Sequence, residues 1–293
     1  MRDRAANNPG GVRAQVRLDP RRPDYAGPVL TPGAVGDDLR DFFHADQIST
    51  SLGGAVTVRL SESASAARQR LVEARFDQAP VMSDRRPVGW VATDSLAGHR
   101  AVRSAMTPLS DCTLVSAESS IASVLQLLPG SRFLFVVDKR GLSGFIVRSD
   151  LDRHAIRSYL YLLIAGVEML LAEIVKSAIP DNQIITSLRS DQKSRFKQAY
   201  AANQETSPAE YLYISDLIGL FAQRPYASDP RLWDKPLTDL LISIKHFRND
   251  VMHPVRSLAA LENVETLANL PRWAAEVTEK LRGIVAFLQR LSA

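Results

Sequence analysis

The chain has 293 residues, of which 45% are hydrophobic and 23% are charged. This length suggests about two domains, and this composition excludes a globally disordered protein. The single cysteine, Cys112, excludes an internal disulfide and a thiolate cluster, which fits a reducing compartment. The longest apolar stretch, residues 159–175, has 17 residues and contains two glutamates, so it is too short and too charged for a good membrane span. We therefore expect a cytoplasmic protein without a membrane segment.

Residues 1–36 form the expected leader of the chain. They contain five prolines and five glycines without sustained periodicity, which predicts disorder. The first 22 residues hold six arginines and two aspartates, so they carry the whole formal net charge of +4. The rest of the chain is formally neutral. Two interpretations of this basic leader stay open: a weak, salt-sensitive attraction to RNA, or a solvated segment without a partner.

From about residue 48 to residue 154 the sequence repeats itself with an offset of 55 residues. The offset sets Gly89 against Gly144, and the apolar residues around the two glycines also coincide. Residues 65–72 lie against residues 120–127, and both segments have helical periodicity. Each copy therefore predicts the order strand, helix, strand, polar tight turn, strand, helix. Two such β-α-β-β-α copies favour a pseudo-twofold pair that shares one core.

Three short motifs accompany the repeat. They are Ala79-Pro80-Val81 at the start of a strand, a Gly-apolar-apolar run after each turn, and Met106-Thr107-Pro108 at the opening of the second copy. With these motifs the pair resembles a tandem of CBS (cystathionine β-synthase) domains over residues 45–154. The resemblance implies an α/β regulatory module, and such modules often bind adenine nucleotides in their clefts. AMP, ADP or ATP is therefore the expected regulatory ligand.

The ribose-binding pattern of that family places Thr or Ser three residues after the glycine, and Asp six residues after it. The second copy has Val147 and Asp150 at these positions, and the first copy has Ala92 and Ser95. Only Asp150 matches the pattern, so the resemblance implies Asp150 as the nucleotide-binding residue. The alternative is that Asp150 caps the N-terminus of the next helix.

The second half of the chain has a helical pattern throughout. A stretch without proline, residues 149–178, predicts one continuous helix that closes the second repeat and continues as a core helix of the following domain. Further amphipathic segments predict helices near residues 189–203, 208–223, 236–252 and 258–291. Short connections between such helices favour an antiparallel bundle. We therefore expect an α+β protein, with an α/β pair followed by an all-α bundle over residues 155–291.

An arginine and a histidine with the spacing R-x4-H end the third of those segments. Asn249 follows Arg248 directly, and Pro254 follows His253. Proline disfavours helical geometry at the preceding residue, so the helix should stop at His253. This motif resembles the R-x4–6-H signature of HEPN domains, a helical family that includes many metal-independent ribonucleases. The apolar stretch around Glu168 is similar to the first helix of that family.

Metal-independent RNA cleavage needs a base for the 2′-hydroxyl, an acid for the 5′-oxygen and positive charge for the phosphorane. Histidine can serve as acid or base, and arginine binds phosphate oxygens in a fork. We therefore predict Arg248, Asn249 and His253 as catalytic residues, with no metal and no required cofactor. One chain supplies one histidine from the motif, and the resemblance implies a homodimer that pairs two motifs on RNA.

A non-catalytic interpretation stays open beside the ribonuclease. Arg248 could pair with a carboxylate, and His253 could cap helix carbonyls. The helical part would then serve for dimerisation, or for binding an antitoxin-like or other protein partner. Two further residues also have two possible interpretations. Glu168 is either an acid near the site or a paired carboxylate, and His246 is expected on another helix face, solvated or packed.

Overall fold

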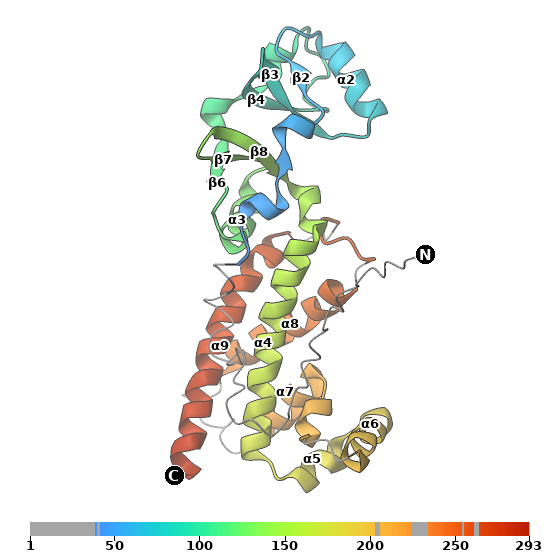
Figure 1. Cartoon of the computed structure of the whole chain (residues 1–293), viewed down its shortest axis with the longest axis vertical. Helices are drawn as coiled ribbons and strands as arrows, with labels where there is room; N and C mark the ends of the chain where they lie inside the picture. The colour runs from blue at the N-terminus through green and yellow to red at the C-terminus, as the bar shows by residue number, and fades with distance from the viewer. Residues whose placement is uncertain are drawn as a thin grey trace, which may run out of the picture.

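The structure is a computed structural model of the chain, and it describes residues 39, 42–202, 206–223, 234–253, 255–260 and 264–292. The expected leader and Pro254 lie outside these ranges. Figure 1 shows an elongated molecule, with β-sheets at one end and long helices at the other. The chain is therefore α+β, with its sheets in the N-terminal part and helices in the C-terminal part.

Two four-stranded sheets form the N-terminal part. The first has the order β2 (Val58–Arg59), β3 (Gln78–Ser83), β4 (Arg86–Ala92) and β5 (Thr107–Pro108). The second has the order β1 (Thr50–Ser51), β8 (Gly141–Val147), β7 (Phe133–Asp138) and β6 (Thr113–Ser116). Strands β7 and β8 begin and end 55 residues after β3 and β4, which confirms the predicted repeat.

The helices of the two copies agree with the repeat only in part. The first helix of each copy is present, as α2 (Ala64–Glu73) and α3 (Ile121–Leu127), as predicted. The closing helix of the first copy was predicted wrongly, because the chain there forms turns and a short 3-10 helix, η4 (Val102–Ser104). Gly98 interrupts this segment with a φ of 80°, in the left-handed region where glycine is favoured.

Aromatic side chains join the two sheets. Trp90 of β4 stacks on Phe133 of β7 with 5.3 Å between ring centroids and 8° between ring planes. Phe133 in turn stacks on Phe145 of β8 at 4.8 Å. These rings belong to one small buried cluster between the sheets. The pseudo-twofold pair is therefore held together by aromatic packing as well as by its edge strands.

The glycines that define the repeat lie where edge strands approach most closely. A Cβ atom on Gly89 would lie 2.2 Å from the carbonyl oxygen of Thr107 in β5. A Cβ atom on Gly144 would lie 2.8 Å from the carbonyl oxygen of Thr50 in β1. Both contacts are with backbone atoms, which cannot move aside as a flexible side chain can. Glycine is therefore required at the same position of both copies.

We expect Gly89→Ala to lower the free energy of unfolding by about 1–3 kcal/mol, the range for overpacking, because β5 must shift away from β4. Gly144→Ala should cost less, since its clash is milder. Denaturant unfolding of each variant measures the effect. Gly54→Ala is the matched control, because nothing lies within 4 Å of a Cβ atom at Gly54. A Gly89→Ala protein as stable as this control would contradict the argument.

The central helix of the C-terminal part is α4 (His154–Ala178). It runs without a break between Arg157 and Ile164, as predicted, but it begins five residues after Ser149. Residues 148–152 form a 3-10 helix, η7 (Arg148–Asp152), and Arg153 is extended between the two helices. The predicted helix start was therefore wrong. The carboxylate of Asp150 accepts hydrogen bonds from the Val147 N–H and the Arg153 side chain, which stabilises this tighter turn.

The other helices of this part are α5 (Asp181–Ser187), α6 (Ser190–Ala201), the 3-10 helix η8 (Pro208–Tyr211), α7 (Ile214–Ala222), α8 (Lys235–Met252) and α9 (Val264–Ser292). Of these, η8, α7, α8 and α9 pack against α4, while α5 and α6 pack against η8. The segment predicted as one helix over 208–223 is thus divided into η8 and α7, α5 was not predicted, and α9 begins six residues later than expected. Figure 1 shows α4 and α9 running side by side along the molecule.

One hydrophobic core extends from the second sheet into the helices. Its buried residues include Ile121 of α3, Ile146 of β8, Leu163 of α4 and Leu281 of α9. The first sheet has a separate core, built around α2. A close-packed interior transmits displacement rather than absorbing it. The second repeat and the helical part are therefore mechanically connected through their shared core.

Helix α4 is longer than the apolar stretch seen in the sequence. Within the described residues it is the one helix long and apolar enough to cross a membrane, so the expectation of too short a span does not hold for the complete helix. A core helix of a bundle has the same composition. Here 56% of its most apolar window is buried by the rest of the protein.

Candidate functional site

The R-x4-H motif lies at the C-terminal end of α8. The carboxylate of Asp234 caps the start of this helix by accepting the N–H of Leu237. The last helical residue is Met252, and His253 has φ −96° and ψ 98°, so the helix ends where the sequence predicted. The N–H of His253 still bonds the carbonyl of Asn249. The motif therefore occupies the final turn and the cap of α8.

Arg248 connects α8 to α4. Its Nε donates a hydrogen bond to Oε1 of Glu168 at 2.5 Å, and each side chain is 25% exposed. Neither terminal Nη atom of Arg248 has a hydrogen-bond partner in the part of the chain that the structure describes. The carboxylate thus holds the guanidinium from one side, and the terminal N–H groups remain for another acceptor. The pairing of Arg248 with a carboxylate, one of the two open interpretations, is therefore observed.

A groove between α7 and α8 runs beside Arg248. It has a volume of about 400 Å³ and is lined by Tyr213, Ile214, Ser215, Lys245, His246, Arg248 and Asn249. We call it the α7–α8 groove. His246 lines it together with Asn249, so His246 borders the same groove as the motif, although it lies two residues from Arg248, about 200° round the helix, as expected. Asn249 follows His246 at a spacing of three residues, about one helical turn, which places both on the same side of α8.

His253 is placed differently from the other two predicted residues. Its side chain is exposed and is not among the lining residues of the α7–α8 groove. Its carbonyl accepts a hydrogen bond from Arg157 of α4 at 3.3 Å. The structure thus brings Arg248 and Asn249 together on the groove, and it leaves His253 at the open end of the helix.

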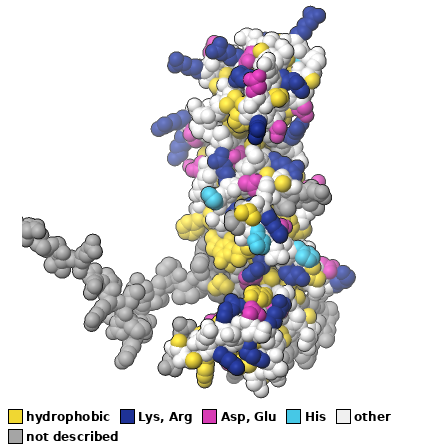
Figure 2. All heavy atoms as spheres, turned by 90° about the vertical axis from the view of Figure 1, so that its right-hand side faces the viewer, with side chains coloured by type: hydrophobic (Ala, Val, Ile, Leu, Met, Phe, Trp, Pro, Cys, Tyr) yellow, Lys and Arg dark blue, Asp and Glu magenta, His cyan; other side chains and the backbone are white. Residues whose placement is uncertain are grey.

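The groove carries positive charge. Lys245 and His246 make no ion pair or side-chain hydrogen bond to any residue that the structure describes. Beyond the other wall, the guanidinium carbons of Arg189 and Arg195 lie 5.6 and 5.8 Å from the ring centre of Tyr213, and these arginines pair with Asp216 and Asp191. Figure 2 shows that histidine side chains gather near mid-height of this face among lysine and arginine side chains. Cations beside an aromatic ring suit a phosphodiester and a stacked base.

Asp150, the predicted ribose contact, is almost completely buried. Its Oδ2 accepts the Val147 N–H at 2.8 Å, and its Oδ1 accepts Nε of Arg153 at 2.7 Å. Nη2 of Arg153 continues to the hydroxyl of Thr50 at 2.7 Å. Burial raises the pKa of Asp150, and the two hydrogen bonds oppose this rise. Asp150 therefore does not cap α4, whose N-cap residue is Arg153; it lies inside η7 and accepts the N–H of Val147, the N-cap residue of η7. A ribose would have to share the carboxylate with Arg153.

A second cleft lies between the two repeats, and Asp150 is not among the residues that line it. It has a volume of about 350 Å³ and is lined by Asp77, Gln78, Leu128, Pro129, Gly130, Ser131, Arg132 and Arg148. We call it the inter-repeat cleft. Arg132 pairs with Asp94 at 3.6 Å, with both side chains largely exposed. Neither arginine of this cleft was predicted from the sequence. The repeat itself could have found Arg132, because Asp77 and Arg132 are 55 residues apart and each directly precedes an equivalent strand.

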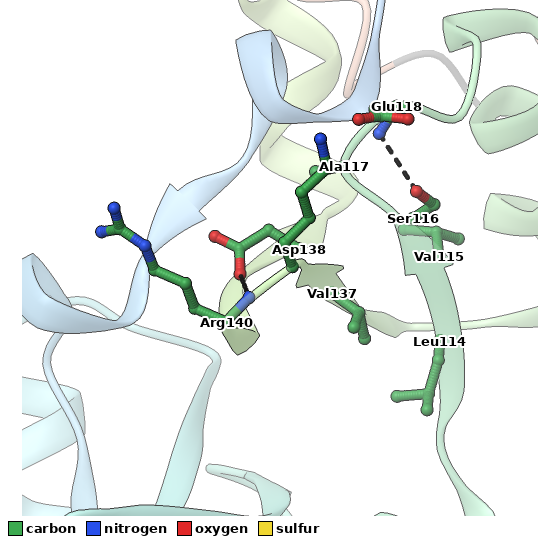
Figure 3. Close-up of a pocket in the computed structure, with 9 residues that line it drawn as sticks. Leu114, Val115, Ser116, Ala117, Glu118, Val137, Asp138 and Arg140 are labelled. Carbon is green, nitrogen blue, oxygen red and sulfur yellow. Dashed lines mark hydrogen bonds between the residues drawn. The ribbon is translucent and has the colours of Figure 1, made fainter.

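A third hollow lies beside β6, the edge strand of the second sheet, and the turn between β7 and β8 (Figure 3). Its volume is about 610 Å³. The carboxylate of Asp138 accepts the N–H of Arg140 at 2.7 Å, and the hydroxyl of Ser116 accepts the N–H of Glu118 at 3.2 Å. These polar groups therefore stabilise their own turns, and they do not converge on a common point.

No group of three or more His, Cys, Asp or Glu side chains that could hold a metal ion occurs within the described ranges.

The N-terminal part is similar to solved structures of CBS domains. A haemolysin-like protein of Oenococcus oeni is 17% identical over 39% of this chain and 90% of its own, with a TM-score of 0.34. A bacterial Mg²⁺ transporter domain of the CNNM/CorC family, solved with ATP, is 20% identical over 41% and 89%, with a TM-score of 0.36. CBSX2, a CBS-pair protein from Arabidopsis thaliana, was solved with AMP and is 24% identical over 40% and 98%, with a TM-score of 0.36.

These similarities concern the fold of the N-terminal part alone. They span about 40% of the chain. A scan of known protein families finds no match to the sequence, and a search of characterised proteins finds none either. The function of the helical part must therefore be argued from its own residues.

Proposed function

We propose that the protein is a metal-independent endoribonuclease of HEPN type, formed by the helices of residues 155–291 and regulated by an adenine nucleotide bound to the repeat pair of residues 45–154. The observation that carries this proposal is the pairing of Arg248 with Glu168. Because Glu168 engages Nε alone, the terminal N–H groups of Arg248 stay available beside a cationic groove. An oriented guanidinium of this kind suits a phosphate group of RNA.

The chemistry assigns a role to each residue of the motif. His253 removes the proton of the 2′-hydroxyl, whose oxygen attacks the adjacent phosphorus. Arg248 stabilises the negative charge of the phosphorane, and Asn249 donates to a phosphate oxygen. The bond from phosphorus to the 5′-oxygen breaks, and an acid protonates that oxygen. The products are a 2′,3′-cyclic phosphate and a 5′-hydroxyl. The motif of a single chain contains one histidine, so the proposed acid is the motif histidine of a second copy.

Exposed apolar side chains support a homodimer at this place. Tyr161 and Met169 of α4 are 46% and 44% exposed, and Met252 of α8 is 40% exposed. They belong to the two helices that the Arg248–Glu168 pair connects. Burial of such side chains against a second copy is favourable, since water is released from apolar surface. The same association brings two motifs together.

Positive charge in the inter-repeat cleft supports the regulatory ligand. Arg132 and Arg148 line a volume of about 350 Å³, and the buried carboxylate of Asp150 lies two residues from Arg148. Guanidinium groups bind phosphate oxygens, and a carboxylate can accept ribose hydroxyls. AMP, ADP and ATP share both features. The nucleotide is therefore proposed as a regulator, and the cleavage chemistry does not require it.

The decisive experiment is RNA cleavage in the presence of EDTA. We expect the wild-type protein to cleave, to leave 2′,3′-cyclic phosphate ends, and to lose this activity in His253→Ala with an unchanged melting temperature, because His253 is exposed at a helix end. His99→Ala is the matched control, since His99 is exposed in the first repeat. Cleavage that requires a divalent metal, or that survives His253→Ala, would remove the motif as the active site.

One observation favours a second candidate, a non-catalytic RNA-binding or partner-binding protein. The side chain of His253 lies outside the α7–α8 groove, and no described residue orients it by a hydrogen bond. In this case RNA binds to the groove without being cut, and the partner is a protein of antitoxin-like or other type. RNA binding that depends on Arg248, with no cleavage at micromolar protein, would favour this candidate over the ribonuclease.

A further inference from the structure

The loop that follows the R-x4-H motif is attached to the end of the second repeat. Asp152 of η7 accepts the N–H of Leu258 on one carboxylate oxygen at 2.6 Å. Its other oxygen accepts the hydroxyl of Ser257, also at 2.6 Å. One carboxylate thus holds two successive residues of the loop, and more than a hundred positions of sequence separate it from them.

Arg157, five residues after Asp152, holds the C-terminal end of α8 in a similar way. Its guanidinium donates to the carbonyls of Asp250, Val251 and His253 at 3.1, 3.4 and 3.3 Å, and also to the carbonyl of Arg256. The carbonyls at a helix C-terminus have no partner within the helix, so Arg157 satisfies the end of α8 directly. Asp152 and Arg157 also pair with each other at 3.4 Å. We call these two residues with loop 255–260 the junction clamp.

Arg148 contacts the junction clamp and also lines the inter-repeat cleft. Its Nε donates to the carbonyl of Ala259 at 2.8 Å, and its side chain also lines the cleft beside Arg132. A neutral carbonyl is a weaker acceptor for a guanidinium than a phosphate oxygen is. An anion in the cleft therefore competes with Ala259 for the same donor.

We propose that Arg148 couples the inter-repeat cleft to the R-x4-H motif. An anionic ligand in the cleft withdraws Arg148 from the Ala259 carbonyl, and loop 255–260 loosens at the end of α8. His253 then gains freedom, because its carbonyl is held by the same clamp. This inference rests on the proposed nucleotide function and adds the route by which the nucleotide acts. Coupling of this kind is reciprocal, so weakening the clamp strengthens ligand binding by the same factor.

ATP and hydrogen exchange of the complete protein test the proposal. Saturating ATP is expected to speed exchange of the amides of Leu258 and Ala260. Arg148→Gln should exchange faster at these amides without ATP, and ATP should add nothing. Asp152→Ala breaks the clamp outside the cleft, and it should bind ATP about 5-fold more tightly, the lower end of typical coupling. Arg140→Gln, at an exposed turn outside the cleft, is the control and should match the wild type.

The possible failures are distinguishable. If calorimetry shows that ATP binds but exchange in loop 255–260 stays unchanged, the coupling through Arg148 is wrong and the nucleotide proposal stands. The same conclusion follows if Asp152→Ala binds ATP no more tightly than the wild type. If ATP does not bind at millimolar concentration, the nucleotide function and this inference are both wrong. Because exchange reports on the loop itself, neither result depends on RNA cleavage.

Discussion

Arg157→Ala is expected to lower the free energy of unfolding by about 1.5–3 kcal/mol, the range for hydrogen bonds to a charged group. The Arg157 side chain is only 11% exposed. It donates to four backbone carbonyls at the end of α8 and pairs with Asp152. Alanine removes a donor from each of those carbonyls, although the His253 carbonyl still accepts the N–H of Arg256, and it leaves Asp152 with one charge partner fewer. The helix end and loop 255–260 should both loosen.

Denaturant unfolding measures this loss, and two variants calibrate it. Arg157→Lys keeps the charge but has no planar fork, so it should recover only part of the stability. Arg256→Ala is the matched control, because the Arg256 side chain is 56% exposed and pairs with Asp250 at the surface. Such a pair typically contributes about 0–1 kcal/mol. Equal stability of Arg157→Ala and Arg256→Ala would mean that the clamp does not stabilise the fold.

Local pattern was sufficient to predict much of the N-terminal fold. The offset of 55 residues locates β7 and β8 to the residue once β3 and β4 are known. Gly89 and Gly144 mark the repeat because each lies against a backbone carbonyl oxygen of the neighbouring edge strand, where a Cβ atom would clash. A steric requirement of this kind fixes the residue type at one position, so it can be recognised in the sequence.

The connection between the two parts could not be predicted in the same way. The bonds of Arg148, Asp152 and Arg157 reach residues that lie 93–111 positions away in the sequence. Charged residues of this kind look like ordinary solvated side chains until the fold brings their partners near. The break at Arg153 was missed for a related reason. A side-chain bond of Asp150 competes with helix propensity there, and propensity alone predicts a continuous helix.

The candidate site was predicted in part. Proline after His253 correctly predicted the helix end, and Glu168 stood out as an acid within an apolar stretch. That Glu168 pairs with Arg248 depends on how α4 packs against α8, which periodicity does not specify. The placement of His246 in the α7–α8 groove likewise depends on α7, whose Tyr213 cap and Ser215 supply the opposite wall. Two interacting helices define this groove, so one helix face could not reveal it.

Arg248→Ala is expected to slow RNA cleavage by on the order of 10²-fold or more, the cost of removing one donor to a developing negative charge. The loss should appear in kcat, because the charge that Arg248 stabilises is greatest in the phosphorane. Arg248→Lys should restore a minor part, since a point charge does not reproduce two parallel donors. Asn249→Ala should cost less than Arg248→Ala, because it removes a neutral donor. Arg272→Ala on the exposed side of α9 is the control and should cleave normally.

Glu168→Gln distinguishes a role of Glu168 in catalysis from a role in the stability of the bundle. Glutamine can still accept from Nε of Arg248 but carries no charge, so it should hold the guanidinium less firmly and reduce kcat by less than Arg248→Ala does. If Glu168 only stabilises the bundle, Glu168→Gln should lower the melting temperature and leave kcat unchanged below it. If instead kcat falls while the melting temperature holds, Glu168 positions Arg248 for catalysis. Normal cleavage by a well-folded Arg248→Ala protein would exclude the guanidinium from the reaction, and with it the ribonuclease proposed for this motif.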